Sequence, residues 1–312
     1  MISVVTAYYN RKSLFIRTLD SFSPSIGKIN FEVIAVDDGS DEEERLEDLV
    51  NKYPFLKVIR LERKNKWYSN SCIPFNVGFS HCTGDKVIIQ NPECYHFGNI
   101  LDYVDKNLRT NEYLSFGCFS LDQVNTMDHK KINDKNNILD LIRNNNRTHE
   151  FNGDLGWYNH SKYRPCAYHF CTAIMINDLL ELGGFDERYA LGYGFDDDEF
   201  IWRIQTKKMN VKIIDDIIVL HQYHYPYQAG KKFKDKNQEN TFDRNQYIFN
   251  HITKCNHPYK VNFIEAKNNQ TQISSDEDTY FYFEYNQLIN KLITKKYSKK
   301  IGVYLLKFLL KF

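Results

Sequence analysis

Short apolar segments alternate with segments of helical spacing over the N-terminal part of the chain. Residues 2–9 and 31–36 are nearly all apolar or β-prone, which predicts two buried strands. Between them, residues 13–22 carry apolar side chains at helical spacing, and Pro24 ends that pattern. By the same criteria we expect an acidic helix over about 41–52, a strand at 57–61, a helix at 71–82 and a strand at 86–89.

The second half of the chain continues this alternation after a polar interval. Residues 120–150 are rich in Asn, Lys and Asp, and they predict a loop-rich insertion or a solvated helix. Residues 173–182 predict a strand that runs into a short helix ended by two glycines. A helix of about ten residues is expected from Asp196, followed by a strand over 211–220. Strands and helices in this order predict an α/β domain with a largely parallel sheet.

Polar and charged residues stand where several predicted strands end. Asp37 and Asp38 follow the second strand, Glu93 follows the strand at 86–89, and His221 follows the final strand. Ligands of such sheets bind beyond the carboxyl ends of the strands, so we expect these side chains at one edge. Each also has an ordinary explanation, because a helix N-cap would account for the aspartates and a solvated loop for the other two.

Four adjacent carboxylates at residues 196–199 begin the predicted helix. Like charges repel, so stability alone would not select four in a row, although a helix N-terminus partly offsets the repulsion. Helical periodicity puts Asp197 on the same face as Ile201, so we expect it to point inward. Glu199 stands four residues before Arg203, which favours a structural ion pair. Asp197 is therefore the candidate general base.

Charge and cysteine usage narrow the class of protein. The chain has 312 residues, and 41 basic against 40 acidic residues give a net charge of +1. This balance excludes a general affinity for nucleic acid, and the basic run at 231–234 fits a solvated face. Seven cysteines without a close pair predict buried thiols in a reducing compartment. Because neither a leader nor a membrane-length segment stands out, we expect a cytoplasmic protein.

One segment could bring the chain to a membrane surface. Residues 301–312 are apolar and basic, and four lysines stand among the residues just before them. A short helix of this composition could make a peripheral membrane contact. Docking of the same segment on the protein itself would explain the pattern equally well, so both alternatives stay open.

Taken together, these features resemble the inverting family-2 glycosyltransferases, which have the GT-A fold. The matching segments are Val4-Val5-Thr6-Ala7-Tyr8-Tyr9-Asn10-Arg11, Val36-Asp37-Asp38-Gly39-Ser40, Asn76-Val77-Gly78-Phe79, Gly84-Asp85, Gly183-Gly184-Phe185-Asp186-Glu187 and the acidic helix start that runs to Arg203. Residues 76–79 and 192–203 are also similar to the animal galactosyltransferases. His221 and Gln222, with residues 239–244, are similar to the bacterial chondroitin polymerases.

The resemblance implies a Rossmann-like, mostly parallel sheet flanked by helices over residues 1–225. Within it, residues 1–100 would bind the nucleotide, residues 101–225 would supply the acceptor-binding and catalytic half, and 226–312 would form a C-terminal helical extension. The implied activity is metal-dependent and inverting. A hexose or N-acetylhexosamine would move from a UDP-sugar to a hydroxyl of a glycan or other glycosylated acceptor, with Mn²⁺ or Mg²⁺ as cofactor.

The matched positions also imply residue roles. Asp197 falls on the family's catalytic base, and Glu93 and His221 fall on its metal ligands. The family's Asp-x-Asp signature falls on Asn91-Pro92-Glu93, so an amide replaces the first carboxylate. The residues implied to bind the nucleotide are Thr6, Ala7, Tyr8, Tyr9, Arg11, Asp37, Asp38, Asn76 and Asn91, with Asp38 accepting from the uracil ring. Those expected at the sugar or acceptor are Trp157, Tyr193, Gly194 and Asp196, although an aromatic core would also explain a single tryptophan or tyrosine.

Two other functions would use similar residues. A metal-dependent phosphohydrolase would need a second metal or an activated water, and the carboxylates here are too far apart in sequence to suggest two metals. A non-catalytic sugar-nucleotide-binding protein would tolerate the amide at Asn91. The presence of both Asp197 and His221 favours an enzyme over that alternative.

Overall fold

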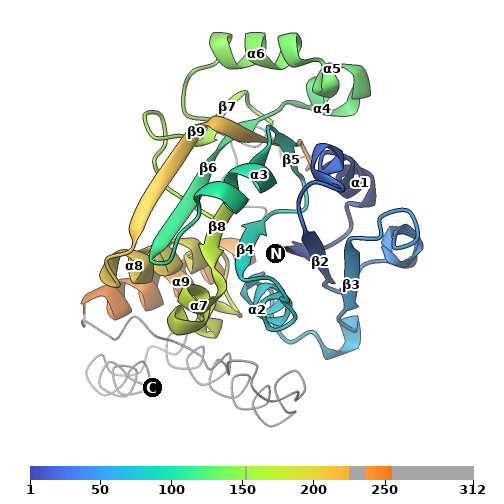
Figure 1. Cartoon of the computed structure of the whole chain (residues 1–312). Helices are drawn as coiled ribbons and strands as arrows, with labels where there is room; N and C mark the ends of the chain where they lie inside the picture. Colours follow the sequence, from blue (N-terminus) through green and yellow to red (C-terminus); the bar gives the residue numbers. More distant parts are fainter. Residues whose placement is uncertain (152, 225–235, 255–312) are drawn as a thin grey trace, which may run out of the picture.

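Figure 1 shows the computed structural model of the chain, which describes residues 1–151, 153–224 and 236–254. The basic run at 231–234 and the apolar segment at 301–312, both singled out from the sequence, lie outside the described residues.

Four parallel strands form the first part of the sheet. They are β1 (Ile2–Tyr8), β2 (Phe31–Asp37), β3 (Leu56–Arg60) and β4 (Lys86–Gln90), in the spatial order β3-β2-β1-β4. Every residue of β2 is buried, which explains why four apolar residues follow one another over 33–36, since a strand covered on both faces need not alternate.

The sheet continues from β4 with mixed pairing. Its further strands are β8 (Cys171–Met175), β6 (Glu112–Ser120), β9 (Asn210–His221) and β5 (Cys94–Phe97), with β7 (Gly156–Asn159) paired to β6. β8 is antiparallel to both β4 and β6, so β6 and its parallel neighbour β9 run in the direction of β1. Only β5, β7 and β8 run the other way among the described strands, which confirms the predicted mostly parallel α/β fold.

Helices cover both faces of this sheet (Figure 1). One face is covered by α1 (Lys12–Asp20) and α3 (Ile100–Asn107), and the other by α2 (Cys72–Ser80), α7 (Ile176–Leu182) and α8 (Asp196–Thr206). A hydrophobic core lies on each face of the sheet, and alternate residues of β1 contribute to the two cores. Val4 packs on the side of α1 and Val5 on the side of α2.

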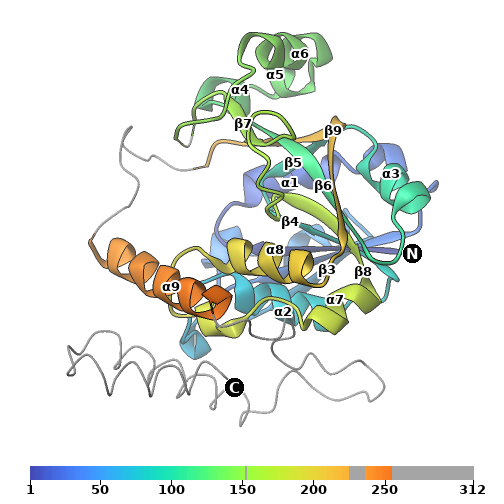
Figure 2. The same cartoon turned by 90° about the vertical axis from the view of Figure 1, so that its left-hand side faces the viewer.

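A small helical insertion projects beyond the end of the sheet in both views (Figures 1 and 2). It comprises α4 (Gln123–Met127), α5 (His129–Asn133) and α6 (Lys135–Asn144), so the predicted insertion is confirmed. Asp128 and Asp134 each accept hydrogen bonds from the first backbone N–H groups of the following helix, which explains the breaks between these short helices.

The acidic helix expected over 41–52 is not present. The segment forms two single-turn 3₁₀ helices, η2 (Glu42–Glu44) and η3 (Glu47–Leu49). Leu46 and Leu49 are buried here, whereas Val50 is 37% exposed, so the apolar stripe is too short to hold a longer helix. Further single turns are η1 (Ser23–Ser25), η4 (Arg63–Asn65) and η5 (Glu187–Tyr189).

The last described element is α9 (Lys236–Lys254), which lies against α8 (Figure 2). Ile248 and Ile252 of α9 are buried, so this helix contributes to the packed molecule. The division into residues 1–225 and a following extension stays a prediction. None of the helices in the described residues combines the length and the apolar character that crossing a membrane requires.

Candidate functional site

The candidate site lies along the edge of the sheet where the parallel strands end. β1, β2, β4 and β9 place Arg11, Asp38, Glu93 and His221 just beyond or at their carboxyl ends. Parallel strands meet at this edge from distant parts of the sequence, so residues from the first hundred positions approach residues beyond position 200. The edge was expected from the sequence, and the contacts below show which side chains it brings together.

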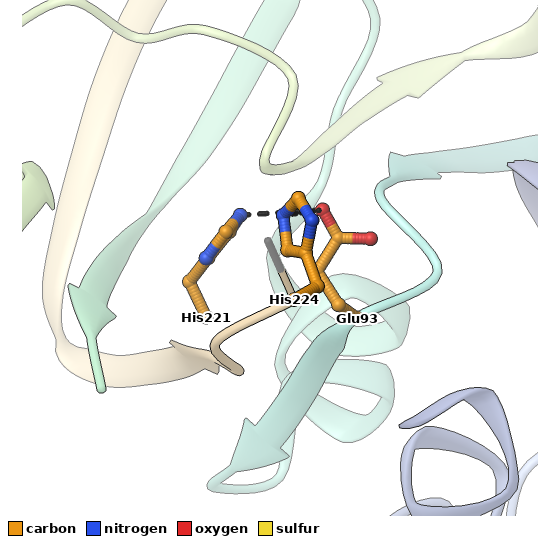
Figure 3. A group of neighbouring side chains, drawn as sticks. All are labelled: Glu93, His221 and His224. Carbon is orange, nitrogen blue, oxygen red and sulfur yellow. Dashed lines mark ion pairs between the residues drawn. The ribbon is translucent and has the colours of Figure 1, made fainter. Parts of the chain in front are cut away.

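Glu93, His221 and His224 form a compact group with all three side chains pointing toward one another (Figure 3). The Nε2 atoms of His221 and His224 each lie 3.2 Å from Glu93 Oε1. Glu93 is 2% exposed and His221 is 4% exposed, so the group is buried. The predicted proximity of Glu93 and His221 is therefore present in the structure.

Arg11 holds the other oxygen of Glu93. Its Nη1 donates to Glu93 Oε2 at 2.6 Å, so the two carboxylate oxygens face different partners. Burial alone would raise the pKa of Glu93, but Arg11, His224 and His221 together lower it well below its usual range. Burial lowers the pKa of His224 to about 4, against the opposing effect of Glu93, so its imidazole is neutral near pH 7. The sequence had predicted a nucleotide contact for Arg11, whereas here it orients Glu93.

The donor set of this group suits a divalent transition-metal ion. The carboxylate oxygen and the two imidazole nitrogens all lie within 4.8 Å of one another. Neutral imidazole together with carboxylate is a combination that Mn²⁺ accepts more readily than Mg²⁺ does. His224 was not among the predicted ligands, although its spacing in His221-Gln222-Tyr223-His224 was a signal that could have identified it.

A second group of side chains surrounds the first turn of α8. Asp196 is 5% exposed and accepts from Asn70 Nδ2 at 2.9 Å. Burial, with Asp197 beside it, raises the pKa of Asp196 to about 6. Asp197 is more open, with 28% of its side chain exposed, and one of its oxygens forms an ion pair with His169. Asp197 is therefore half-buried, and it is the carboxylate of this pair that solvent can reach.

The next two acidic residues of α8 have structural partners. Glu199 is fully buried and forms the expected ion pair with Arg203, whose Nη1 also donates to the backbone oxygen of Leu182. Asp198 accepts a hydrogen bond from the Tyr168 hydroxyl. The repulsion among the four adjacent carboxylates is offset because each of them interacts with a different partner. The different partners also distinguish the roles of the four residues.

The loop before α8 has an unusual backbone that α9 supports. Gly194 and Phe195 both have positive φ, 70° and 65°, and Phe195 carries a side chain in this disfavoured region. Asn245 of α9 is fully buried, and its Nδ2 donates to the backbone oxygen of Gly194 at 2.8 Å. A Cβ atom at Gly192 would collide with the Asn245 side chain, so this approach requires glycine. The Phe242 ring adds a contact to Phe195 at 4.9 Å between centroids.

Two consecutive residues connect the two groups. His169 pairs with Asp197, while the Phe170 ring lies 6.2 Å from the His221 ring and its backbone oxygen accepts from the N–H of Asn91 at 3.2 Å. Adjacent Cα atoms are only about 3.8 Å apart. The metal-ligand candidates and the acidic helix start therefore flank the same short segment.

At the predicted nucleotide end, Asp38 is engaged by Lys66 and Tyr68. Lys66 Nζ donates to Oδ2 at 2.6 Å and the Tyr68 hydroxyl donates to Oδ1 at 2.7 Å. Burial raises the pKa of Asp38, although Lys66 and Tyr68 oppose this rise. Tyr9 is 41% exposed beside them, with Lys66 over its ring at 5.0 Å. Ala7 is half-buried on the same side of β1.

Four predicted nucleotide contacts are structural side chains instead. Thr6 and Tyr8 alternate with Ala7 along β1 and are buried, and the Tyr8 hydroxyl donates to the backbone oxygen of Glu44 at 2.6 Å. Asp37 is fully buried and accepts from the N–H of Ser40 at 2.8 Å, which forms the turn after β2. Asn76 is buried as well, and donates to the backbone oxygen of Phe185 at 2.9 Å.

The predicted sugar contacts divide in the same way. Trp157 is 3% exposed and packs on Phe119 with ring centroids 5.2 Å apart, so it belongs to the core and no sugar can stack on it. Tyr193 is 46% exposed next to Gly194, in the loop before α8. Asn91, a predicted nucleotide contact, is half-buried two residues before Glu93. Of the predicted sugar and acceptor residues, Tyr193 is thus the one whose side chain is exposed.

Solved structures with a similar fold share little sequence with this chain. S. aureus TarS is 13% identical with a TM-score of 0.49, over 96% of this chain and 46% of that one. The TarS 1–349 structure is also 13% identical, with a TM-score of 0.49, over 99% and 79%. Mannosyltransferase PcManGT from Pyrobaculum calidifontis, in complex with GDP-Man and Mn²⁺, is 14% identical with a TM-score of 0.46, over 99% and 84%. The chain therefore spans less than half of the longer TarS structure.

Comparison with family models gives two adjoining matches. A comparison with curated proteins gives no match. The model described as the N-terminal domain of galactosyltransferase matches residues 159–227, which include the start of α8 and His221. The model described as glycosyl transferase family 2 matches residues 3–164, just over half of the chain, and includes Arg11, Asp38 and Glu93. On this match the chain belongs to glycosyl transferase family 2.

Proposed function

We propose that the protein is a metal-dependent inverting glycosyltransferase. It transfers a hexose or N-acetylhexosamine from a UDP-sugar to a hydroxyl group of a glycan or other glycosylated acceptor. The observation that carries this proposal is the pairing of two groups across one short segment, with Glu93, His221 and His224 on one side and Asp197 on the other. Membership of glycosyl transferase family 2 supports the same conclusion.

Glu93, His221 and His224 are proposed to hold Mn²⁺ through Oε1 and the two Nε2 atoms, which already converge. A divalent ion bound there would offset the negative charge that develops on the departing nucleotide diphosphate. Arg11 keeps Glu93 in position from the other side.

Asp197 is proposed as the general base. Transfer with inversion needs a carboxylate that takes the proton from the acceptor hydroxyl as its oxygen attacks the sugar carbon. Asp197 lies in the first turn of α8, and 28% of its side chain is exposed, so an acceptor hydroxyl can reach it. Asp196 is a poorer candidate, because it is buried, is hydrogen-bonded to Asn70, and has a raised pKa.

Asp38, Lys66 and Tyr9 are proposed to bind the nucleotide base. A carboxylate can accept more hydrogen bonds than the two that Lys66 and Tyr68 provide, so Asp38 retains acceptor capacity for the uracil ring nitrogen. The Lys66 ammonium stands next to it as a donor for a ring carbonyl. The exposed ring of Tyr9 offers a surface for stacking.

The direct test is a screen of nucleotide sugars for transfer and hydrolysis, with and without Mn²⁺. Asp197→Asn should lower transfer by about 10²- to 10⁴-fold, because it removes the proton acceptor, while UDP binding stays unchanged. Asp140→Asn, which changes an exposed aspartate of α6, is the matched control and should behave as the unaltered chain. Normal transfer by the Asp197→Asn protein would show that this residue is not the base.

A further inference from the structure

His169 is a buried titratable residue that the proposed mechanism leaves without a role. It is 7% exposed and packs against two phenylalanine rings that also contact each other, with their centroids 5.4 Å apart. The Phe75 ring is 5.0 Å from its imidazole at 81°, and the Phe185 ring is 4.8 Å away at 62°. These two edge-on contacts restrict the plane of the imidazole, so its nitrogens have defined directions.

Both the side chain and the backbone of His169 face a single oxygen of Asp197. The imidazole Nδ1 is paired with Asp197 Oδ1, and the backbone N–H of His169 points at the same oxygen from 3.5 Å. Within the described part of the chain, no hydrogen bond reaches the other oxygen, Oδ2. Because 28% of the Asp197 side chain is exposed, Oδ2 remains accessible.

We propose that His169 is the positioning residue of the catalytic carboxylate: its Nδ1–H holds Asp197 Oδ1, so that Oδ2 faces the acceptor. This inference rests on the proposed function. In the transfer step, the acceptor O–H proton moves to Oδ2 and the acceptor oxygen forms a bond to the anomeric carbon. The bond from that carbon to the diphosphate oxygen breaks, and its electron pair leaves with the nucleotide. The proton on Nδ1 stays on His169 throughout, so His169 is neither acid nor base.

The charges around the imidazole agree with this arrangement. Asp196 and Asp197 are the charged groups that face it, both from α8. Burial alone would lower the pKa of His169, but these carboxylates, Asp197 foremost, raise it on balance. The packing neighbours Phe75 and Phe185 carry no charge. An ionised Asp197 therefore stabilises the proton on Nδ1.

Two substitutions test the contribution of the His169 nitrogen separately from that of its ring. His169→Phe keeps an aromatic ring packed against Phe75 and Phe185 but removes Nδ1, whereas His169→Asn removes the ring but keeps an amide N–H near the Nδ1 position. We expect His169→Phe to keep the melting temperature and to lower kcat by about 10- to 100-fold, with KM for the donor unchanged. His169→Asn should lose thermal stability yet transfer sugar faster than His169→Phe. His129→Asn, at an exposed histidine of α5, is the control.

A second measurement tests the contact without any activity. The imidazole nitrogens of His169 can be followed by NMR across a pH titration, with the signal assigned by its loss in His169→Asn. Asp197→Asn should lower the pKa of His169, since a facing negative charge is lost. An unchanged titration would overturn the inference.

The kinetic outcomes are equally decisive. Full kcat in His169→Phe, or slower transfer by His169→Asn than by His169→Phe, would show that the residue only fills space, and would overturn the inference while leaving the proposed function intact. If the unaltered protein transferred no sugar from any donor, the proposed function would fail instead. The NMR titration would then still decide whether His169 holds Asp197.

Discussion

In the proposed metal site, the two oxygens of the Glu93 carboxylate have different partners. Oε2 is held by Arg11, and Oε1 is shared by the two imidazoles. His224 would supply a third ligand. In the proposed site, this histidine follows β9 and stands more than a hundred residues after Asn91, and it would make up for the carboxylate that the amide of Asn91 replaces.

Removal of one ligand tests this compensation. Glu93→Gln keeps the shape of the side chain but removes its charge, and His224→Ala removes one imidazole. Each should weaken Mn²⁺-dependent UDP binding by about 10-fold or more, measured by calorimetric titration of UDP at fixed Mn²⁺. His129→Ala, an exposed histidine of the insertion, serves as the control. Equal affinities in all three proteins would exclude this group as the metal site.

The candidate site residues that could be predicted from the sequence are reactive side chains at the end of a regular strand or at the start of a helix. Glu93, His221 and Asp197 could be placed because each directly follows or begins such an element. His169 and Lys66 could not, since both lie in irregular segments where no periodicity indicates a direction. The sequence could not show that Trp157 is buried, because tryptophan occurs both in hydrophobic cores and in sugar-binding sites, and only the packing around the ring distinguishes the two.

At the scale of elements, α9 and the loop before α8 depend on each other. The loop adopts positive φ at Gly194 and Phe195, and Asn245 compensates by hydrogen-bonding its backbone. Arg244 extends the same support, donating to Asn245 Oδ1 at 2.7 Å and to the backbone oxygen of Arg188 at 3.0 Å. The direction of Asp197 is therefore determined partly by a helix that begins forty residues later.

Substitutions on both sides of this contact should be non-additive. Gly192→Ala places a Cβ where Asn245 lies, and Asn245→Ala removes the side chain that supports the loop, so each should lower kcat by about 10-fold or more. The double variant should be no slower than the slower single variant, because both changes remove one contact. Gln246→Ala, exposed on the same helix, should have no effect. Multiplying effects in the double variant would show that the contact does not support Asp197.

Regular elements were predictable where their burial follows a simple pattern. β1, β2 and α8 have one buried face or complete burial, and their sequences show it. The segment over 41–52 has helix-forming residues but only two buried leucines, so tertiary contacts determined its shape. β6 is almost wholly buried inside the sheet, but its sequence does not predict a strand, because Gly117 and two serines interrupt the apolar residues.

At the scale of the whole molecule, α9 belongs to the folded unit although it follows the matched family segments. Ile248 and Ile252 are buried, and burial of such a side chain contributes about 1.5–3 kcal/mol. Two of them account for a sizeable part of the stability of an ordinary domain, about 5–15 kcal/mol. The order of elements predicted the α/β class correctly, but sequence alone had no means of placing this helix beside the site.

Two shortened chains test this view by thermal denaturation. A chain ending at residue 254 keeps α9 and serves as the reference for the melting temperature and for Mn²⁺-dependent UDP binding. A chain ending at residue 224 should melt several degrees lower, because the partners of Ile248 and Ile252 become exposed. Equal melting temperatures would contradict a structural role for α9.

Co-sedimentation of the full chain and the 254-residue chain with liposomes tests the membrane contact proposed for residues 301–312.

The ion pair between Arg11 and Glu93 has a consequence for the order in which ligands arrive. In the proposed metal site one positive and one negative side chain cancel, and the two histidines would bind a cation only as neutral groups, so these residues alone would give a free divalent ion little net electrostatic attraction. The further negative charge would come from the diphosphate. Ion and nucleotide would then strengthen each other's binding by the same factor.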